Sequence, residues 1–361
     1  MIPALFFSII GAGHLYIFHV AASAFPRFSI PIGLIVAAFF LCLILSIVFE
    51  KRGQLKLSLP FSYIGYAWLG FAYLWFNSAI FLDLLSLVIP SLDPRDQFYW
   101  SLFPALALAL IGYAGARRTR VVKVELSSPK LPSEGLRVLQ ISDLHLGDGS
   151  SLSHVKRIIR RIEELKPDLI VSTGDLFDGY LQMMGPYIEA LRELRAPLGK
   201  FAVSGNHEVY AGLEPALERT EEAGFVLLRN RSENISDHLT VAGIDDPASY
   251  DAESYARAEE STFENVSENR YTVFLNHRPS LHENTFKHFD LQLSGHTHGG
   301  QIFPFILLTK LAYKAKVGLS LIAPQTYLYL SRGTGSWGPQ LRLFAPTEIT
   351  LFELSSSDSK S

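Results

Sequence analysis

The first 116 residues constrain the fold most, because they carry only nine charged side chains in a chain of 361 residues that has 32 basic and 35 acidic ones. Four uncharged apolar runs fill this stretch, at residues 3–26, 28–49, 61–82 and 98–116. Each run is close to the ~20 residues that cross the hydrocarbon core of a bilayer as an α-helix. We therefore predict a membrane domain over residues 1–116 with four transmembrane α-helices.

Basic residues near the ends of these runs predict their orientation. Residues 51–56 and 117–123 are rich in Lys and Arg, whereas the other two loops have one arginine each. Because basic loops stay in the cytoplasm, the N-terminus and the C-terminal domain should both be cytoplasmic, and the cell inner membrane is the expected location. A cleaved signal peptide is the alternative for the first run, but no basic residue precedes that run and three more follow it. The only cysteine, Cys42, lies in the second run, so no intramolecular disulfide can form.

Beyond residue 117 the pattern changes to strands that alternate with helices. Apolar strands are predicted at residues 136–141, 169–172, 201–203 and 225–228, and helices at 155–165, 187–194 and 213–223. This alternation favours an α/β fold in which helices cover a parallel sheet. Residues 239–354 are richer in strands, as a second sheet would be. Residues 355–361 form a polar tail that we expect to be disordered.

Polar residues that can bind metal follow the predicted strands. In chain order they are Asp143 and His145, then Asp175, then Asn206, then His277, and finally His296 and His298. Ligands gather at the carboxyl ends of the strands in such sheets. Taken singly, the Asp and Asn residues are more often turn or capping residues, and a lone histidine is more often structural. Their joint occurrence favours a metal site. Glu208 is interpreted as a helix-start residue and is left out of the site.

This order of motifs resembles the calcineurin-like metallophosphoesterase superfamily over residues 121–354. The resemblance implies a four-layer α/β/β/α sandwich over residues 117–354 and two divalent metal ions. It implies that Asp175 bridges the ions, and it assigns three further ligands to each ion: Asp143, His145 and His298 to one, and Asn206, His277 and His296 to the other. Carboxylate, imidazole and amide ligands suit Mn, Fe or Zn. A water that bridges the ions is then the expected nucleophile.

Two further residues acquire roles from the same resemblance. His207 is similar to the family histidine that contacts the phosphoryl group or protonates the leaving oxygen, and Asp178 to the acid that orients this histidine. The motifs Asn276-His277-Arg278-Pro279 and Gly243-Ile244-Asp245-Asp246-Pro247 look like the membrane-anchored branch, which includes transmembrane proteins with a metallophosphoesterase domain. Asn276 is a departure, since many members have a small residue there.

The predicted function is metal-dependent hydrolysis of a phosphoester, as a phosphatase or phosphodiesterase, on the cytoplasmic face of a membrane. One alternative is cleavage of the pyrophosphate of a nucleotide-linked lipid, and another is a membrane scaffold or receptor with a structural metal site. Residues 117–361 contain 27 basic and 31 acidic residues, which argues against nucleic acid as a substrate. Residues 302–322 are apolar but contain three lysines. We interpret them either as a surface helix that receives a lipid-linked substrate or as an element of the second sheet.

Overall fold

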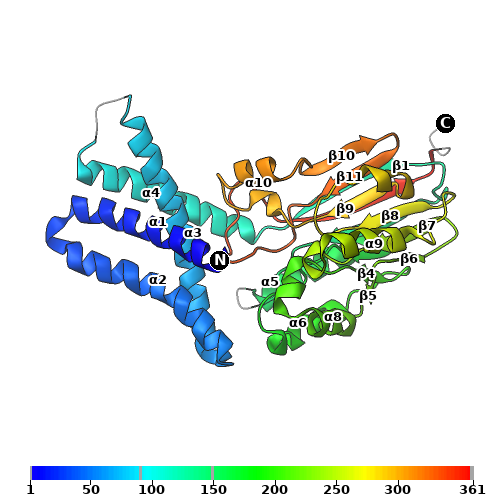
Figure 1. Cartoon of the computed structure of the whole chain (residues 1–361), viewed down its shortest axis with the longest axis horizontal. Coiled ribbons are helices and arrows are strands. Elements are labelled where there is room, and N and C mark those ends of the chain that lie inside the picture. Colours follow the sequence, from blue (N-terminus) through cyan, green and yellow to red (C-terminus); the bar gives the residue numbers. More distant parts are fainter. Residues whose placement is uncertain (1, 89–91, 148–149, 358–361) are drawn as a thin grey trace. The chain divides into compact units, whose positions relative to one another are not determined.

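The computed structural model describes residues 2–88, 92–147 and 150–357 (Figure 1). The chain divides into two compact units: residues 1–115 with 338–343, and residues 116–337 with 344–361. The first unit contains four helices, which are α1 (Ile2–Ala24), α2 (Ser29–Lys51), α3 (Leu55–Leu85) and α4 (Pro94–Ala116). All four are long and apolar enough to cross a membrane, so the predicted set of four spanning helices is confirmed.

Polar side chains within the helical unit have partners inside it. The indole nitrogen of Trp68 donates a hydrogen bond to His14 Nε2 at 2.8 Å. The indole nitrogen of Trp75 donates to Ser101 Oγ at 3.0 Å. Such pairing is what a hydrocarbon environment requires, because no water is present there to satisfy polar groups.

Residues 338–343 come from the C-terminal part of the sequence but belong to the helical unit. The backbone N–H of Arg342 donates to the Gly112 carbonyl at 2.9 Å, and Leu341 is fully buried. A Cβ atom on Gly112 would lie 2.7 Å from the Leu341 side chain, so the close approach requires glycine here. The boundaries predicted from the sequence place this segment in the soluble domain. The structure groups it with the helices because its apolar side chain is buried among them.

The second unit contains two six-stranded sheets. The first sheet has the order β1-β12-β2-β3-β4-β5, with β1 (Arg120–Ser127), β12 (Glu348–Ser355), β2 (Leu136–Ile141), β3 (Leu169–Ser172), β4 (Lys200–Ala202) and β5 (Val226–Leu227). The second has the order β10-β11-β9-β8-β7-β6, with β10 (Gly318–Ala323), β11 (Thr326–Leu330), β9 (Leu291–Ser294), β8 (Tyr271–Leu275), β7 (Leu239–Gly243) and β6 (Arg231–Asn234).

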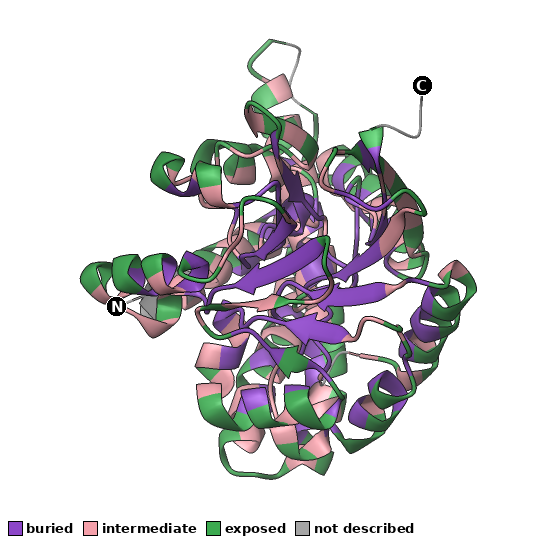
Figure 2. Ribbon diagram, turned by 90° about the vertical axis from the view of Figure 1, so that its right-hand side faces the viewer, coloured by how far each residue is buried: buried purple, intermediate pink, exposed green. Residues whose placement is uncertain are grey.

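Alternating side chains show how the layers stack. In β3, Ile170 packs into the core that contains α5 (Leu152–Leu165), α6 (Gly185–Arg192) and α8 (Leu213–Glu222), while Val171 packs against the second sheet. In β8, Val273 faces the first sheet and Phe274 packs with α9 (Ala252–Phe263). Successive side chains of a strand point to opposite faces, so the order is helices, sheet, sheet, helix. The predicted four-layer sandwich is confirmed, and the inner strands β3, β4, β7, β8 and β9 are buried along their length (Figure 2).

Some details differ from the predictions. Strands β2 to β5 are parallel as expected. Strand β12 was expected in the second sheet with the other strands of residues 239–354, but it lies in the first sheet between β1 and β2 and pairs with β2 antiparallel. Pairing with β1 extends β12 to Ser355, and the Ser357 N–H donates to the Ser128 carbonyl, so the predicted disordered tail starts too early. Backbone pairing orders these residues without burial of apolar side chains. The rest of that tail, residues 358–361, lies outside the described residues.

Candidate metal centre

Loops at the carboxyl ends of five strands bring the predicted ligands together. These loops follow β2, β3, β4, β8 and β9, and the short helix α7 (Asn206–Ala211) begins directly after the β4 loop. Five of the predicted ligands have a positive φ angle: Asp143, His145, Asp175, His296 and His298. Non-glycine residues rarely adopt this conformation, and such strain persists only where the surrounding structure enforces it. The fold therefore holds these side chains in place at an energetic cost.

The first cluster consists of Asp143, His145 and His298. His145 Nε2 lies 3.0 Å from His298 Nε2, and His298 Nε2 lies 3.6 Å from Asp143 Oδ1. His145 Nε2 is also 3.6 Å from Asp175 Oδ2. Asp143 is fully buried, and its two oxygens accept hydrogen bonds from the His296 N–H and the Ser142 hydroxyl.

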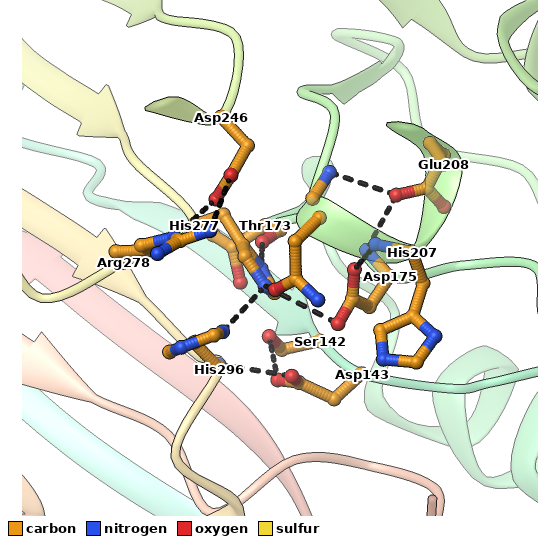
Figure 3. A network of polar contacts seen from close by, with 12 residues as sticks. Ser142, Asp143, Thr173, Asp175, His207, Glu208, Asp246, His277, Arg278 and His296 are labelled. Carbon is orange, nitrogen blue, oxygen red and sulfur yellow. Dashed lines mark hydrogen bonds and ion pairs between the residues drawn. The ribbon is translucent and has the colours of Figure 1, made fainter. Parts of the chain in front are cut away.

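The second cluster consists of Asn206, His277 and His296, and it lies on the other side of Asp175. His277 Nδ1 is 2.8 Å from the Thr173 carbonyl oxygen, which can only accept, so Nδ1 carries a proton. Three atoms with lone pairs lie 3.2 Å from His277 Nε2: Asp175 Oδ2, Asn206 Oδ1 and His296 Nδ1. Figure 3 shows His277, His296 and Asp175 converging in this way.

In both clusters, oxygen and nitrogen atoms with lone pairs lie within 3.6 Å of one another, and a positive charge between them would stabilise this arrangement. Burial alone would lower the pKa of His277, but the charges of Asp175 and Asp143 outweigh it and raise the pKa to about 10. A cation would meet the same demand, and Asp143 with His145 and His298, and Asp175 with His277 and His296, are two groups that can hold one. Ligands at ~2.1 Å from one ion lie about 3.0 to 3.4 Å from each other, which is close to the spacings of both clusters. The residues therefore fit divalent metal ions.

His207 and Asp178 lie beside the first cluster. His207 Nδ1 is 3.0 Å from Asp178 Oδ1, and His145 Nδ1 is 3.3 Å from Asp178 Oδ2, so one carboxylate contacts both imidazoles. Burial would lower the pKa of His207, but the hydrogen bond that His207 donates to Asp178 outweighs it and raises the pKa to about 9. A protonated His207 can donate a hydrogen bond from Nε2 to an oxygen at the centre, while Asp178 accepts one from Nδ1 and so fixes the orientation of the ring.

Glu208 is a positioning residue that the sequence interpretation left out. Its side chain is buried, and it accepts four backbone hydrogen bonds: from Gly205 and Asp175 to Oε2 and from Leu176 and Phe177 to Oε1, at 2.7 to 3.2 Å. Glu208 does belong to the start of α7, as predicted, but its carboxylate also fixes the turn that carries Asp175. The signal in the sequence was Glu208 at the third position after Gly205, where a helix-start glutamate can reach back to the backbone.

Further residues around the centre were not identified from the sequence. Arg278 forms a two-pronged ion pair with the fully buried Asp246. Aromatic rings contact two of the histidines: Trp337 lies 5.8 Å from His207, Tyr210 lies 5.5 Å from the same ring, and Tyr313 lies 5.7 Å from His296, measured between ring centroids. Arg278 and Tyr210 are close in sequence to His277 and His207, whereas the tertiary structure brings Asp246, Tyr313 and Trp337 to the site from distant segments.

Comparison with known proteins agrees with this geometry. The family model described as Calcineurin-like phosphoesterase matches residues 136–300. A metallophosphoesterase of Aquifex aeolicus is 35% identical over 69% of this chain and 97% of its own length. The chain belongs to the calcineurin-like metallophosphoesterase family. Another metallophosphoesterase, YkuE of Bacillus subtilis, is 33% identical over 73% of this chain and 98% of its own. A transmembrane protein with metallophosphoesterase domain from Danio rerio is 31% identical over 70% of this chain and 62% of its own.

Family membership establishes the class of the protein. It is a metallophosphoesterase, that is, a phosphoester hydrolase, with Asp and His clusters that can bind metal and four helices that can cross a membrane.

Proposed function

We propose that this metallophosphoesterase hydrolyses a phosphoester with two divalent metal ions, as a phosphatase or phosphodiesterase on the cytoplasmic face of a membrane. The position of Asp175 carries the proposal. Its Oδ2 lies 3.6 Å from His145 Nε2 in the first cluster and 3.2 Å from His277 Nε2 in the second. A carboxylate so placed can contribute to both sites, which a single structural ion would not need.

Each ligand residue has a defined part in this proposal. Asp143, His145 and His298 would hold one ion, Asn206, His277 and His296 would hold the other, and Asp175 would contribute to both sites. When bound, two such ions supply an activated water as nucleophile and stabilise the charge of the phosphoryl group.

His207 supplies the proton for the leaving group in this proposal. The His207 side chain is 14% exposed, so its Nε2 atom can reach a substrate oxygen. Its Nδ1 atom is held by Asp178. A carboxylate partner that raises the pKa of the imidazole keeps it protonated and fixes its orientation, which suits a general acid. Asp178 is thus a positioning residue and His207 a catalytic one.

The distribution of basic residues around the four helices supports a catalytic unit on the cytoplasmic side. Lys51 ends α2 and Arg52 follows it, Lys56 lies in the first turn of α3, and Arg117 and Arg118 follow α4. Because loops rich in Lys and Arg stay on the cytoplasmic side, both termini should lie there. In a bacterium this corresponds to the inner membrane.

A lipid-linked substrate is the second element of the proposal, and α10 (Ile306–Ala312) favours it. Residues 302–322 were interpreted either as a surface helix or as an element of the second sheet. The structure divides them between α10 and strand β10, so each interpretation fits a part of the segment. The helix and the residues before it expose apolar side chains, namely Phe303, Phe305, Leu307, Leu308 and Leu311. Such a surface with Lys310 beside it is typical of a helix that lies in a membrane interface. Tyr313, directly after α10, contacts His296, so the helix lies next to the centre.

Metal content and turnover together test the two-ion proposal. We expect Asp175→Asn and His296→Ala in the full-length protein to lower bound metal below two ions per chain and to abolish hydrolysis of nitrophenyl phosphoesters. The scaffold alternative instead expects bound metal without turnover in the wild type. Full activity with undiminished metal in either variant would contradict the two-ion site, and Glu214→Gln, an exposed residue outside the site, serves as control.

A further inference from the structure

The structure contains two arginines that pair with consecutive buried aspartates, and only one of them faces the metal centre. Asp245 and Asp246 are both fully buried. Arg229 donates from Nε to Asp245 at 2.9 Å, and Arg278 donates from Nε and Nη2 to Asp246, both at 2.9 Å. The two pairs are therefore chemically alike, but they lie in different surroundings.

The two guanidinium groups differ in what their remaining nitrogens contact. Arg229 Nη1 donates to both oxygens of Glu214, at 2.9 and 3.1 Å, so this arginine is neutralised by two carboxylates. Arg278 Nη1 has no hydrogen-bond partner among the residues that the structure describes, and its side chain is 27% exposed. A guanidinium has five N–H donors, and Asp246 occupies only two of those of Arg278.

Arg278 lies next to the second cluster. It follows His277 directly in the sequence, and His277 Nε2 lies 3.2 Å from His296 Nδ1 in that cluster. In Figure 3, Arg278 and His296 lie on one side of the centre and His207 on the other. The free donors of Arg278 are thus near the centre, on the side opposite the group that we assign to the leaving oxygen.

We propose that Arg278 binds a second phosphate group of the substrate, beyond the scissile phosphoryl group and on the side away from His207. The inference rests on the proposed hydrolase function and narrows its substrate class to diphosphates. Asp246 holds the plane of the guanidinium rigid, so little side-chain entropy is lost when an anion binds. The unused N–H groups then meet phosphate oxygens, which planar guanidinium groups bind well.

Two inhibitors that differ by one phosphonate group test this inference. The full-length protein in detergent is loaded with Mn²⁺, and methylphosphonate and methylenediphosphonate are measured as inhibitors of nitrophenyl phosphoester hydrolysis. We expect Arg278→Gln to weaken the diphosphonate by about 10- to 100-fold, the effect of a lost hydrogen bond to a charged group, and methylphosphonate by less than about 3-fold. Arg229→Gln, the matched control, should change neither inhibitor. Bound metal and the thermal shift caused by each inhibitor are measured on the same samples.

Each other outcome has a definite meaning. Equal weakening of both inhibitors, or no weakening of either, would overturn the inference. Loss of bound metal in Arg278→Gln would also overturn it, because Arg278 would then position His277 instead. If the glutamine variant does not fold, Arg278→Lys keeps the charge beside Asp246 but loses the planar fork, and should still weaken the diphosphonate selectively. A wild-type protein that binds two metals but hydrolyses no phosphoester would refute the proposed function rather than this inference.

Discussion

Glu208 gives the sharpest test of how the fold supports the centre. We consider the substitution Glu208→Gln, which changes one oxygen to an NH₂ group and little else. Each carboxylate oxygen of Glu208 accepts two backbone N–H groups, and the carboxylate is buried. A glutamine amide has one oxygen, so in either orientation two backbone N–H groups face the NH₂ donor.

The expected loss of stability follows from these contacts. A hydrogen bond to a charged group contributes roughly 1.5 to 3 kcal/mol, so two lost bonds destabilise the unit by about 3 to 6 kcal/mol. For a domain of this size, this corresponds to a fall in apparent Tm on the order of 10 °C. The turn that carries Asp175 would also move, and loss of such a supporting contact typically lowers metal affinity about 10- to 100-fold.

Thermal unfolding and metal titration measure both effects. The full-length protein is unfolded with and without Mn²⁺, and bound metal is counted after dialysis against a weak chelator. Glu214→Gln is the control, because Glu214 is exposed and pairs only at the surface. If Glu208→Gln kept the wild-type Tm and metal content, the four hydrogen bonds would contribute nothing to the position of Asp175, contrary to this prediction.

Three other predictions concern the reaction and the membrane. His207→Ala should keep both metals but lower kcat by roughly 10²- to 10⁴-fold, with a smaller loss for good leaving groups such as nitrophenol; an equal loss for all leaving groups would exclude acid catalysis. A fluorescent reporter at the C-terminus should be cytoplasmic and a tag at Leu92 accessible from outside, and the reverse pattern would invert the topology. Changing Phe303, Phe305 and Leu308 to Ser should lower activity on lipid substrates in vesicles and spare a small soluble ester; a parallel loss of both would make the segment structural.

Much of the fold could be predicted because its signals are local. The four helices carry uncharged runs long enough to cross a bilayer, and β2 and β3 are short apolar runs that end at turn residues. Strand β1 was missed because it is an edge strand with alternating exposed residues and a basic start, which looks like a linker after α4. The antiparallel pairing of β12 was missed because strand direction depends on the path of a distant segment.

Some residues of the candidate metal centre could likewise be predicted from local sequence motifs, and others depend on contacts between distant segments. Ligand types at strand ends can be recognised from the sequence, because the carboxyl ends of parallel strands meet at one edge of a sheet. The Arg278–Asp246 pair and the contact of Trp337 with His207 join residues 32 and 130 positions apart, and no local pattern indicates which of many arginines or aromatic residues lie there. Glu208 falls between these cases, since its position was recognisable but its four hydrogen bonds were not.

The glycines beside the ligands follow from how closely the ligand loops approach one another. A Cβ atom on Gly295 would overlap the Ser142 hydroxyl and the Asp143 carboxylate, and one on Gly205 would overlap Asp175. In each case the glycine of one loop lies against a carboxylate of the candidate metal centre from another loop, so a side chain there would push that carboxylate out of its cluster. The motifs Gly-His-x-His and Gly-Asn-His thus combine two requirements: the histidine or asparagine can bind metal, and the glycine before it makes room for the carboxylate of a neighbouring strand. Contacts between neighbouring loops therefore require a glycine before each of these residues, and this requirement appears in the sequence as a short motif within each loop.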